Sequence, residues 1–232
     1  AGMGYAVAGW EVVGVDIEPQ PRYPFPFIQH DALTLDPRFL AHFDAIHASP
    51  PCLRDTVMKH AKGAKGDAHP DLVPVTAAML RAQPLPYVLE NVESPSIRAT
   101  FRDPIRLCGS GFDLGAAGFQ LQRHRLFEVN FPLTFEAPGC NHQGPTIGIY
   151  GGHVRNRAAK NGGRGTRDFV GYDKPRLAKE AFGLEPDAPF TMAEISQGIP
   201  PAYTMFFARN LALHIRGMDE WPVQIALPSE PR

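Results

Sequence analysis

The chain has 232 residues, of which 44% are hydrophobic and 20% charged, and its formal net charge at pH 7 is -1. This size allows one good core with a small appended subdomain. The near-neutral charge excludes nucleic-acid binding through overall basicity, so such a function would need charge that is unevenly distributed along the chain. No stretch is apolar enough for a membrane span and no signal-peptide pattern opens the chain, so we expect a soluble, cytoplasmic protein.

The cysteines Cys52, Cys108 and Cys140 are odd in number and lack the paired C-x-x-C spacing of a structural zinc site. We therefore expect neither a disulfide scaffold nor a metal site, and one free reactive thiol is reasonable. Cys108 has apolar and glycine neighbours, which indicates a small residue of the core.

The first half of the chain alternates between strand-like and helix-like segments. Apolar runs and helical spacing predict a short helix at 1–8, strands at 10–17, 27–33 and 43–48, a helix at 70–83 and a strand at 87–92. Strands that alternate with helices predict an α/β fold with a largely parallel sheet.

Acidic residues stand at the ends of the first two strands. Asp16 ends one of them, where nucleotide-binding α/β folds place an acid that accepts hydrogen bonds from ribose hydroxyls, and an ordinary strand-ending aspartate is the alternative. Asp31 follows the second strand and could receive the exocyclic amine of an adenine ring, although a lone aspartate there is more often a helix or turn cap.

Two prolines, Pro50 and Pro51, end the strand at 43–48 and precede Cys52. Prolines fix φ and cannot extend a ladder of hydrogen bonds, so Cys52 must stand on a loop just past a strand end, where open α/β sheets keep their chemistry. The polar residues 53–67 suit a loop that closes over a substrate, or simply a solvated surface loop.

Later segments add an acid, two arginines and a basic region. Glu90 ends a buried strand, and Arg123 and Arg125 have the alternate spacing that places two side chains on one face of a strand. Residues 105–127 have a hairpin-like pattern. Residues 153–179 are basic and rich in glycine, which suits a segment that follows a phosphate backbone and becomes ordered on binding, or a merely flexible, solvated loop.

The chain closes with two predicted helices. Thr191 and Glu194 have the spacing of a capping box at the start of the first, and residues 205–215 form an amphipathic second helix.

A thiol, an acid and two guanidiniums in this order resemble the DNA cytosine-5 methyltransferases. The matching motifs are Pro-Pro-Cys at 50–52, Glu-Asn-Val at 90–92 and Arg-x-Arg at 123–125. The resemblance implies a Rossmann-like α/β catalytic domain over 1–130 and 190–216, a small basic target-recognition region over 131–189, and a tail over 217–232. The short recognition region suggests a phage or bacterial enzyme of a restriction-modification system.

The resemblance also implies a role for each matching residue. Cys52 would add to carbon 6 of the cytosine, Glu90 would act at N3, and of Arg123 and Arg125 one would hold the base carbonyl or the carboxylate and the other the backbone or the loop. S-adenosylmethionine would be the methyl donor, and the residues implied in binding it are Asp16, Ile17, Asp31, Ala32 and Pro50. The residues implied in binding the substrate are Ser49, Pro51, Asn91, Arg155, Arg157 and Arg164.

The partner implied is double-stranded DNA, whose target base must leave the stack to reach the site, with the protein acting as a monomer away from membranes. The sequence departs from the family's pattern in three places. The first strand and its glycine-rich turn are not found before Ala1, Leu121 replaces a glutamine, and residues 208–211 stand where Gly-Asn-x-Val is expected. Two alternatives stay open: an enzyme that modifies a free pyrimidine nucleotide by the same thiol addition, and an inactive relative that only binds DNA.

Overall fold

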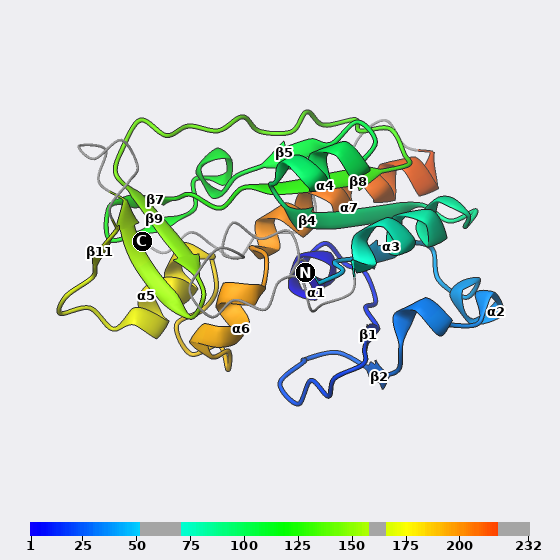
Figure 1. The fold of residues 1–232 in the computed structure, drawn as a ribbon, viewed down its shortest axis with the longest axis horizontal. Helices are drawn as coiled ribbons and strands as arrows, with labels where there is room; N and C mark the ends of the chain where they lie inside the picture. The colour runs from blue at the N-terminus through cyan, green and yellow to red at the C-terminus, as the bar shows by residue number, and fades with distance from the viewer. Residues whose placement is uncertain (52–70, 158–165, 218–232) are drawn as a thin grey trace.

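The computed structural model describes residues 1–51, 71–157 and 166–217, and these residues form a mixed α/β fold (Figure 1). In chain order the elements that build it are α1 (Gly2–Val7), β1 (Gly14–Asp16), β2 (Phe27–Gln29), η1 (Ala32–Thr34), α2 (Pro37–Leu40), β3 (Ile46–Ala48), α3 (Leu72–Arg81), β4 (Tyr87–Val92), α4 (Pro95–Thr100), β5 (Ile105–Leu107), η4 (Gly109–Phe112), β6 (Gly115–Ala116), β7 (Phe119–Leu121), β8 (Arg125–Val129), β9 (Thr146–Tyr150), β10 (His153–Arg157), β11 (Thr166–Asp168), α5 (Lys174–Ala181), α6 (Met192–Gln197) and α7 (Pro201–Arg216). The predicted α/β class is confirmed, but the prediction of a largely parallel sheet is wrong, because most of the strand pairs among the described residues are antiparallel.

The central sheet has the strand order β3-β4-β8-β5. β3 and β4 are parallel, with Ala48 opposite Leu89, whereas β8 runs antiparallel to both β4 and β5. The carboxyl ends of β3 and β4 therefore meet at one edge of the sheet, where Pro50 and Glu90 follow the paired residues. The hairpin-like pattern at 105–127 is confirmed in the pairing of β5 with β8.

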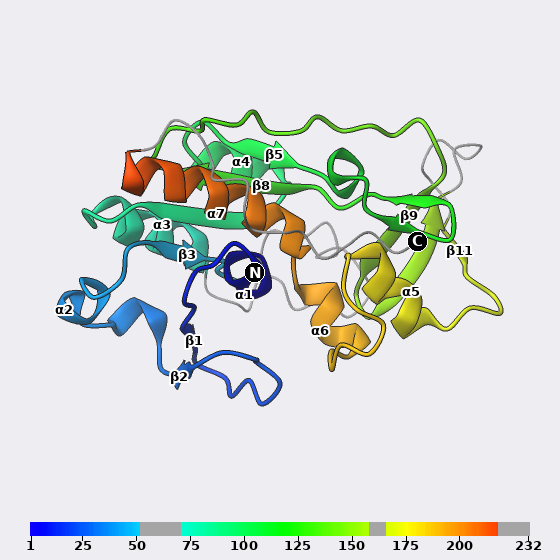
Figure 2. The ribbon, with the colours of Figure 1, turned by 180° about the vertical axis from the view of Figure 1, so that it is seen from behind.

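Helices cover both faces of this sheet (Figures 1 and 2). Val88 and Phe127 pack with Phe207 of α7 on one face, while Leu89 and Leu126 belong to a cluster with α3 and α4 on the other. Because side chains alternate along a strand, residues two apart share a face. Glu90 therefore lies on the same face of the sheet as Val88, the face covered by α7.

Helix α1 lies directly against α7, and a glycine permits the close approach. A Cβ on Gly4 would lie 2.1 Å from the carbonyl oxygen of Pro201 and 2.2 Å from Oγ1 of Thr204, so no other residue fits here without moving the backbone. The Thr204 hydroxyl also donates a 2.7 Å hydrogen bond to the carbonyl of Ala1. These contacts fix the first helix to the last.

A second, five-stranded sheet has the order β11-β10-β9-β7-β6, with β7 parallel to β9. Its apolar residues pack with α5 and α6 into a core of their own. β6 and β7 precede residue 131, so this sheet takes strands from both sides of the predicted domain division, which stays a prediction. The long connection from β8 to β9 runs along the molecule in both ribbon views.

The predicted elements differ from the observed ones mainly at their ends. The strand predicted at 10–17 is shorter, and only Gly14–Asp16 pairs with β2. The last helix begins at Pro201, because proline suits the first helical position. The capping box of Thr191 and Glu194 is confirmed. The basic segment at 153–179, for which we considered a flexible loop, contributes β10, β11 and α5.

Some predictions fall outside the described residues. Cys52, the loop at 53–67 and Arg164 lie there, as does almost all of the predicted tail. Within the described parts of the chain, no helix combines the length and the apolar character that crossing a membrane requires.

Candidate active site

Glu90 and Arg125 form an ion pair at the end of β4. Arg125 Nε lies 2.8 Å from Glu90 Oε1, and the two side chains are only 14% and 8% exposed. Arg125 is opposite Val92 in the register, so it reaches Glu90 along the diagonal between antiparallel strands. Within the described residues, Glu90 Oε1 has no donor in hydrogen-bonding alignment. Arg125 therefore compensates the charge of this buried carboxylate at short range, while the hydrogen-bonding capacity of Oε1 is not used by an aligned donor among those residues.

Asn91 connects the end of β4 to the proline segment that follows β3. Its Nδ2 donates a 2.9 Å hydrogen bond to the carbonyl oxygen of Pro50, and its Oδ1 accepts one of 2.9 Å from the backbone N–H of Val92. The Glu-Asn-Val motif thus holds the backbone two residues before Cys52. Pro51 is exposed beside it, and Cys52 itself lies outside the described residues.

Arg123 is placed differently from Arg125. Its guanidinium donates hydrogen bonds to the backbone carbonyls of Ile149, Ser196 and Gly198, and it lies 5.1 Å from the ring centroid of Phe182. Residues 122–124 are not in a strand, so the alternation rule that predicted a shared face does not apply to them. The structure therefore places Arg125 at the carboxylate and Arg123 at the backbone between the second sheet and α6.

A cavity of about 510 Å³ lies between β1 and β3, which we call the β1–β3 cavity. Its wall includes Asp16 at the end of β1 and Ser49 after β3, together with the aromatic side chains of Tyr23 and Phe43. The volume is within the range of small-molecule sites. The carboxylate of Asp16 accepts hydrogen bonds from Glu18 N and from Gln20 Nε2, which fix its orientation.

The other residues implied in cofactor binding are not part of this wall. Ile17 is 63% exposed beside the cavity, and Pro50 accepts the hydrogen bond from Asn91. Asp31 caps η1 by accepting from the N–H of Leu33, the role that a lone aspartate more often has, and Ala32 is the first residue of that turn. Asp16 is thus the residue whose position best fits an adenosine-type ligand, because a carboxylate there can accept from ribose hydroxyls.

His47 forms part of the cavity wall and is held on both sides. Its Nδ1 lies 3.0 Å from the hydroxyl of Tyr5, and its Nε2 lies 3.1 Å from Oγ of Ser49. Burial lowers the pKa of His47 to about 3, so the imidazole is neutral at physiological pH. A neutral ring in this position does not repel a cationic group of a ligand.

The cavity wall is completed by the end of α6. Glu194, Gln197 and Gly198 line it. Glu194 receives two hydrogen bonds from Arg22 Nε, of 2.9 and 3.0 Å, while the guanidinium of Arg123 holds the carbonyl of Gly198. Arg123 therefore positions a wall of the cavity, a role that the sequence did not assign to it.

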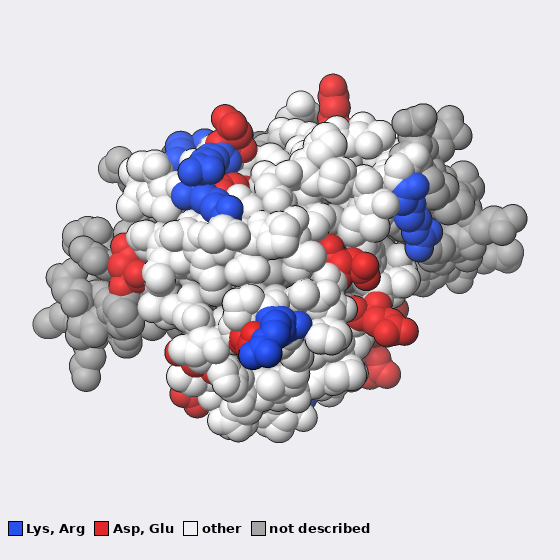
Figure 3. Space-filling model, turned by 90° about the vertical axis from the view of Figure 1, so that its right-hand side faces the viewer, with Lys and Arg blue, Asp and Glu red and all other residues white. Residues whose placement is uncertain are grey.

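The residues implied in DNA contact are described only in part. Arg155 lies on β10 opposite Asp168 of β11, and Ser49 is exposed at the end of β3. On the face of the molecule shown in Figure 3, Lys and Arg form separate small groups with Asp and Glu between them. Among the described residues that this view shows, no continuous basic surface is present.

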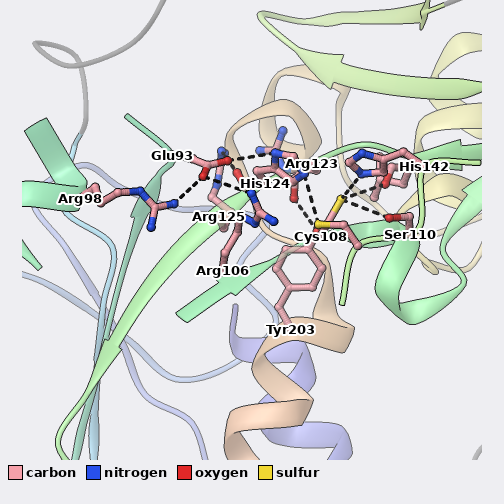
Figure 4. A network of polar contacts seen from close by, with 12 residues as sticks. Glu93, Arg98, Arg106, Cys108, Ser110, Arg123, His124, Arg125, His142 and Tyr203 are labelled. Carbon is pink, nitrogen blue, oxygen red and sulfur yellow. Dashed lines mark hydrogen bonds and ion pairs between the residues drawn. The ribbon is translucent and has the colours of Figure 1, made fainter. Parts of the chain in front are cut away.

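Four residues that sequence analysis left apart come together beside the arginines. Cys108, His124, Cys140 and His142 each place a ligand atom within 4.8 Å of those of the other three, and we call them the Cys/His cluster. Figure 4 shows Cys108, His124 and His142 next to Arg123 and Arg125. The available sequence signal was the Cys-x-His pair at 140–142 together with a histidine inside the Arg-x-Arg motif.

Cys108 is buried as predicted, but it is not a simple core residue. Its Sγ lies 3.2 Å from His142 Nε2 and 3.5 Å from the hydroxyl of Ser110. Burial raises the pKa of this thiol, but hydrogen bonds from His124, His142 and Ser110 outweigh that effect and lower the pKa to about 5. The pKa of Cys140 is raised by burial and by the neighbouring Cys108.

No protein-family model and no curated protein sequence matches the chain. Among solved structures, the chain is similar to the crystal structure of the Spodoptera frugiperda DNMT2 E260A/E261A/K263A mutant, with a TM-score of 0.39 and 18% sequence identity. The match covers 59% of this chain and 49% of that one, so the chain spans about half the length of this neighbour.

Proposed function

We propose that this chain is an S-adenosylmethionine-dependent methyltransferase that acts on carbon 5 of cytosine in DNA. The observation that carries the proposal is the geometry at the end of β4. There a buried Glu90 is paired with Arg125, and the adjacent Asn91 holds the Pro50 carbonyl two residues before Cys52. A carboxylate, a guanidinium and the backbone that leads to a thiol thus converge from three separate motifs.

Each group has a task in this reaction. Carbon 5 of cytosine is a poor nucleophile until the Cys52 thiolate adds to carbon 6, which moves electrons onto the ring and makes carbon 5 nucleophilic. Glu90 stabilises the charge that develops at N3 by hydrogen bonding or proton transfer, and Arg125 holds the carboxylate in place. After carbon 5 has formed its bond to the methyl group, loss of the carbon-5 proton expels the thiolate and restores the double bond.

The β1–β3 cavity is the proposed cofactor site. S-adenosylmethionine supplies an electrophilic methyl group when bound. Asp16 would accept hydrogen bonds from its ribose hydroxyls, and the aromatic side chains of Tyr23 and Phe43 would provide apolar walls. The neutral His47 adds no positive charge to this wall that would repel the sulfonium group.

Double-stranded DNA is the proposed substrate, with Arg155, Arg157 and Arg164 as backbone contacts. The local excess of basic residues at 153–179 supports this assignment, in a chain whose formal net charge is only -1. A free pyrimidine nucleotide would not need these residues. Neutralising all three should therefore weaken activity on duplex DNA and make the remaining activity less sensitive to added salt, because fewer counterions are released on binding; unchanged activity would favour the nucleotide.

The direct test is covalent trapping. The protein is incubated with S-adenosylmethionine and duplex DNA that contains 5-fluorocytosine. Fluorine cannot leave carbon 5 as a proton does, so the methylated base stays bonded to the enzyme. We expect a denaturation-resistant adduct that peptide mapping places at Cys52. An adduct at a different residue would contradict the proposed mechanism.

Cys52→Ser is the matched control for trapping and turnover. The serine hydroxyl is a far weaker nucleophile at neutral pH, so methyl transfer should fall by at least about 10³-fold while duplex binding is retained. A serine variant that methylates at near the parent rate would refute the assigned nucleophile. If the parent binds duplex DNA but calorimetry gives no heat with S-adenosylmethionine, the chain is instead an inactive relative that binds DNA.

A further inference from the structure

The Cys/His cluster has the composition and spacing of a closed metal site. His142 Nε2 lies 3.2 Å from Cys108 Sγ, and His124 Nε2 lies 3.4 Å from Cys140 Sγ. An ion with Zn–S bonds of about 2.3 Å and Zn–N bonds of about 2.0 Å at tetrahedral angles places sulfur and nitrogen ligands about 3.5 Å apart. These two sulfur–nitrogen separations match such an ion, and all four ligand atoms lie within 4.8 Å of one another.

The orientation of His124 is fixed by a contact at its other ring nitrogen, as is usual for metal-binding histidines. Its Nδ1 lies 3.0 Å from Glu93 Oε2, which directs Nε2 toward the two sulfurs. Glu93 is in turn held by Arg98, whose Nη2 donates a 2.6 Å hydrogen bond to Oε1, and by Arg106 at 3.7 Å (Figure 4). A carboxylate behind a histidine in this way fixes its tautomer and increases its basicity as a ligand.

The four ligands come from three separate segments of the chain. Cys108 follows β5 and is the N-cap of η4, His124 precedes β8, and Cys140 and His142 lie in the long connection between β8 and β9. In the described residues that connection has no strand or helix of its own over 130–145. Two side chains from it nevertheless converge on a buried cysteine and on a histidine with a fixed orientation, which random packing does not explain.

We propose that Cys108, His124, Cys140 and His142 bind one structural zinc ion. Two thiolates and two imidazoles in a tetrahedral arrangement favour Zn²⁺, and four protein ligands leave no open position for a substrate. The ion would anchor the β8–β9 connection to the central sheet. Because His124 lies between Arg123 and Arg125, it would also fix both arginines relative to each other.

The test begins with the full-length chain purified without chelators from zinc-supplemented medium under reducing conditions. Mass spectrometry of the metal content should give one zinc per chain. After the zinc is replaced by Co²⁺, the visible spectrum should show the ligand-field bands of tetrahedral cobalt with thiolate charge-transfer bands. Removal of the metal should lower the midpoint of thermal unfolding, because a ligand that binds only the native state stabilises it.

Variants separate this site from adventitious binding. Cys140→Ser and His142→Asn should lose the metal and the cobalt spectrum, and circular dichroism reports whether each still folds. If they do not fold, Glu93→Gln provides the second test, since loss of the supporting carboxylate should weaken zinc affinity by about 10–100-fold while all four ligands remain. Cys52→Ser and the exposed His153→Gln are matched controls that should keep one zinc.

Three results would overturn the proposal. The first is a parent protein that neither retains zinc nor gives a tetrahedral cobalt spectrum. The second is a cobalt spectrum that is the same in the parent and in Cys140→Ser. The third is a disulfide between Cys108 and Cys140 in the parent protein as purified from zinc-supplemented medium under reducing conditions. All of these readouts are independent of methyl transfer, so they do not depend on the function proposed above.

Discussion

Two buried carboxylates on the central strand pair, Glu90 and Glu128, are satisfied to very different degrees. Glu128 is 1% exposed and receives hydrogen bonds from Arg81, from the hydroxyl of Tyr87 and from the N–H of Arg102. Glu90 is 8% exposed and has an ion pair with Arg125, yet within the described residues its Oε1 lacks an aligned donor. The first arrangement is complete, whereas the second leaves one buried oxygen without an aligned donor in the described part of the chain.

The two side chains are on opposite faces of the same strands. Glu128 is opposite Leu89 and shares the face covered by α3, while Glu90 is opposite Phe127 on the face covered by α7. A buried carboxylate whose hydrogen bonds are all made by the protein stabilises one packing arrangement. A buried carboxylate at a strand end with an oxygen that lacks an aligned donor indicates a binding or catalytic group. The comparison therefore predicts that Glu90 affects activity and Glu128 affects stability.

The largest expected effect is on turnover. Glu90→Gln keeps the size of the side chain but removes the charge and the titrating proton, so methyl transfer should fall by about 10²–10⁴-fold. The free energy of unfolding should fall by less than when the Glu128 pair is broken, because Arg125 loses its anion while the amide oxygen can still accept a hydrogen bond. Single-turnover kinetics and chemical denaturation measure the two quantities. If the Glu90→Gln variant is inactive only because it has unfolded, Glu90 would affect stability as Glu128 does, and the predicted difference between the two carboxylates would be wrong.

The second prediction concerns stability. Arg81→Met removes the guanidinium that pairs with Glu128 and leaves a buried carboxylate without its cation, so unfolding should become easier by about 3–5 kcal/mol. The double variant Arg81→Met/Glu128→Gln should recover part of this loss, because the amide carries no charge. Denaturant titration of the parent, both single variants and the double variant gives the coupling energy. A coupling near zero would show that the pair is not structural.

The contrast between these carboxylates also shows what the sequence can and cannot reveal. Glu90 was identifiable because it ends an apolar strand in a three-residue motif, and parallel strands bring such ends together. Glu128 gave no signal, since its partner Arg81 is 47 positions away on a helix. The Cys/His cluster was missed for the same reason: its ligands are brought together by a connection without regular structure, not by spacing along the chain.

The ends of the strands were also difficult to predict from the sequence, because they depend on contacts between distant residues. The apolar run at 10–17 favoured a long strand, but only three of its residues pair with β2. Trp10 instead directs its indole N–H to the carbonyl of Ala208 on α7, at 3.3 Å. Tertiary contacts of this kind override local preference and cannot be inferred from the pattern of residues alone.

The pH dependence of stability gives a third prediction. Burial raises the pKa of Glu128, but its hydrogen bonds from Arg81, Arg102 and Tyr87 outweigh this effect and hold the pKa below its usual value. A depressed carboxyl pKa contributes stability that is present above the unfolded value of about 4.3 and is lost as the pH falls through the folded value. Stability should therefore decline on acidification below that pH.

Glu194 also has a lowered pKa, held down by Thr191 and Arg22 against the effect of burial, so it contributes to the pH dependence in the same direction. The difference between the parent and Glu128→Gln isolates the contribution of Glu128. The variant should lose less stability between neutral and acidic pH than the parent does. Parallel unfolding curves at all pH values would mean that Glu128 titrates normally and would weaken the contrast with Glu90.

The smallest expected effect concerns the contact between the two strand ends. Asn91→Ala removes the hydrogen bond to the Pro50 carbonyl, which should cost about 1 kcal/mol of stability. That bond holds the backbone leading to Cys52, so catalytic turnover should fall more than substrate affinity. Single-turnover kinetics measures the first quantity and duplex-binding titration measures the second. Asn130→Ala is the matched control, since Asn130 also bridges backbone groups but at the opposite end of β4. Equal effects of the two substitutions on turnover would show that Asn91 contributes to packing alone, and that Glu90 acts without a precisely held neighbouring loop.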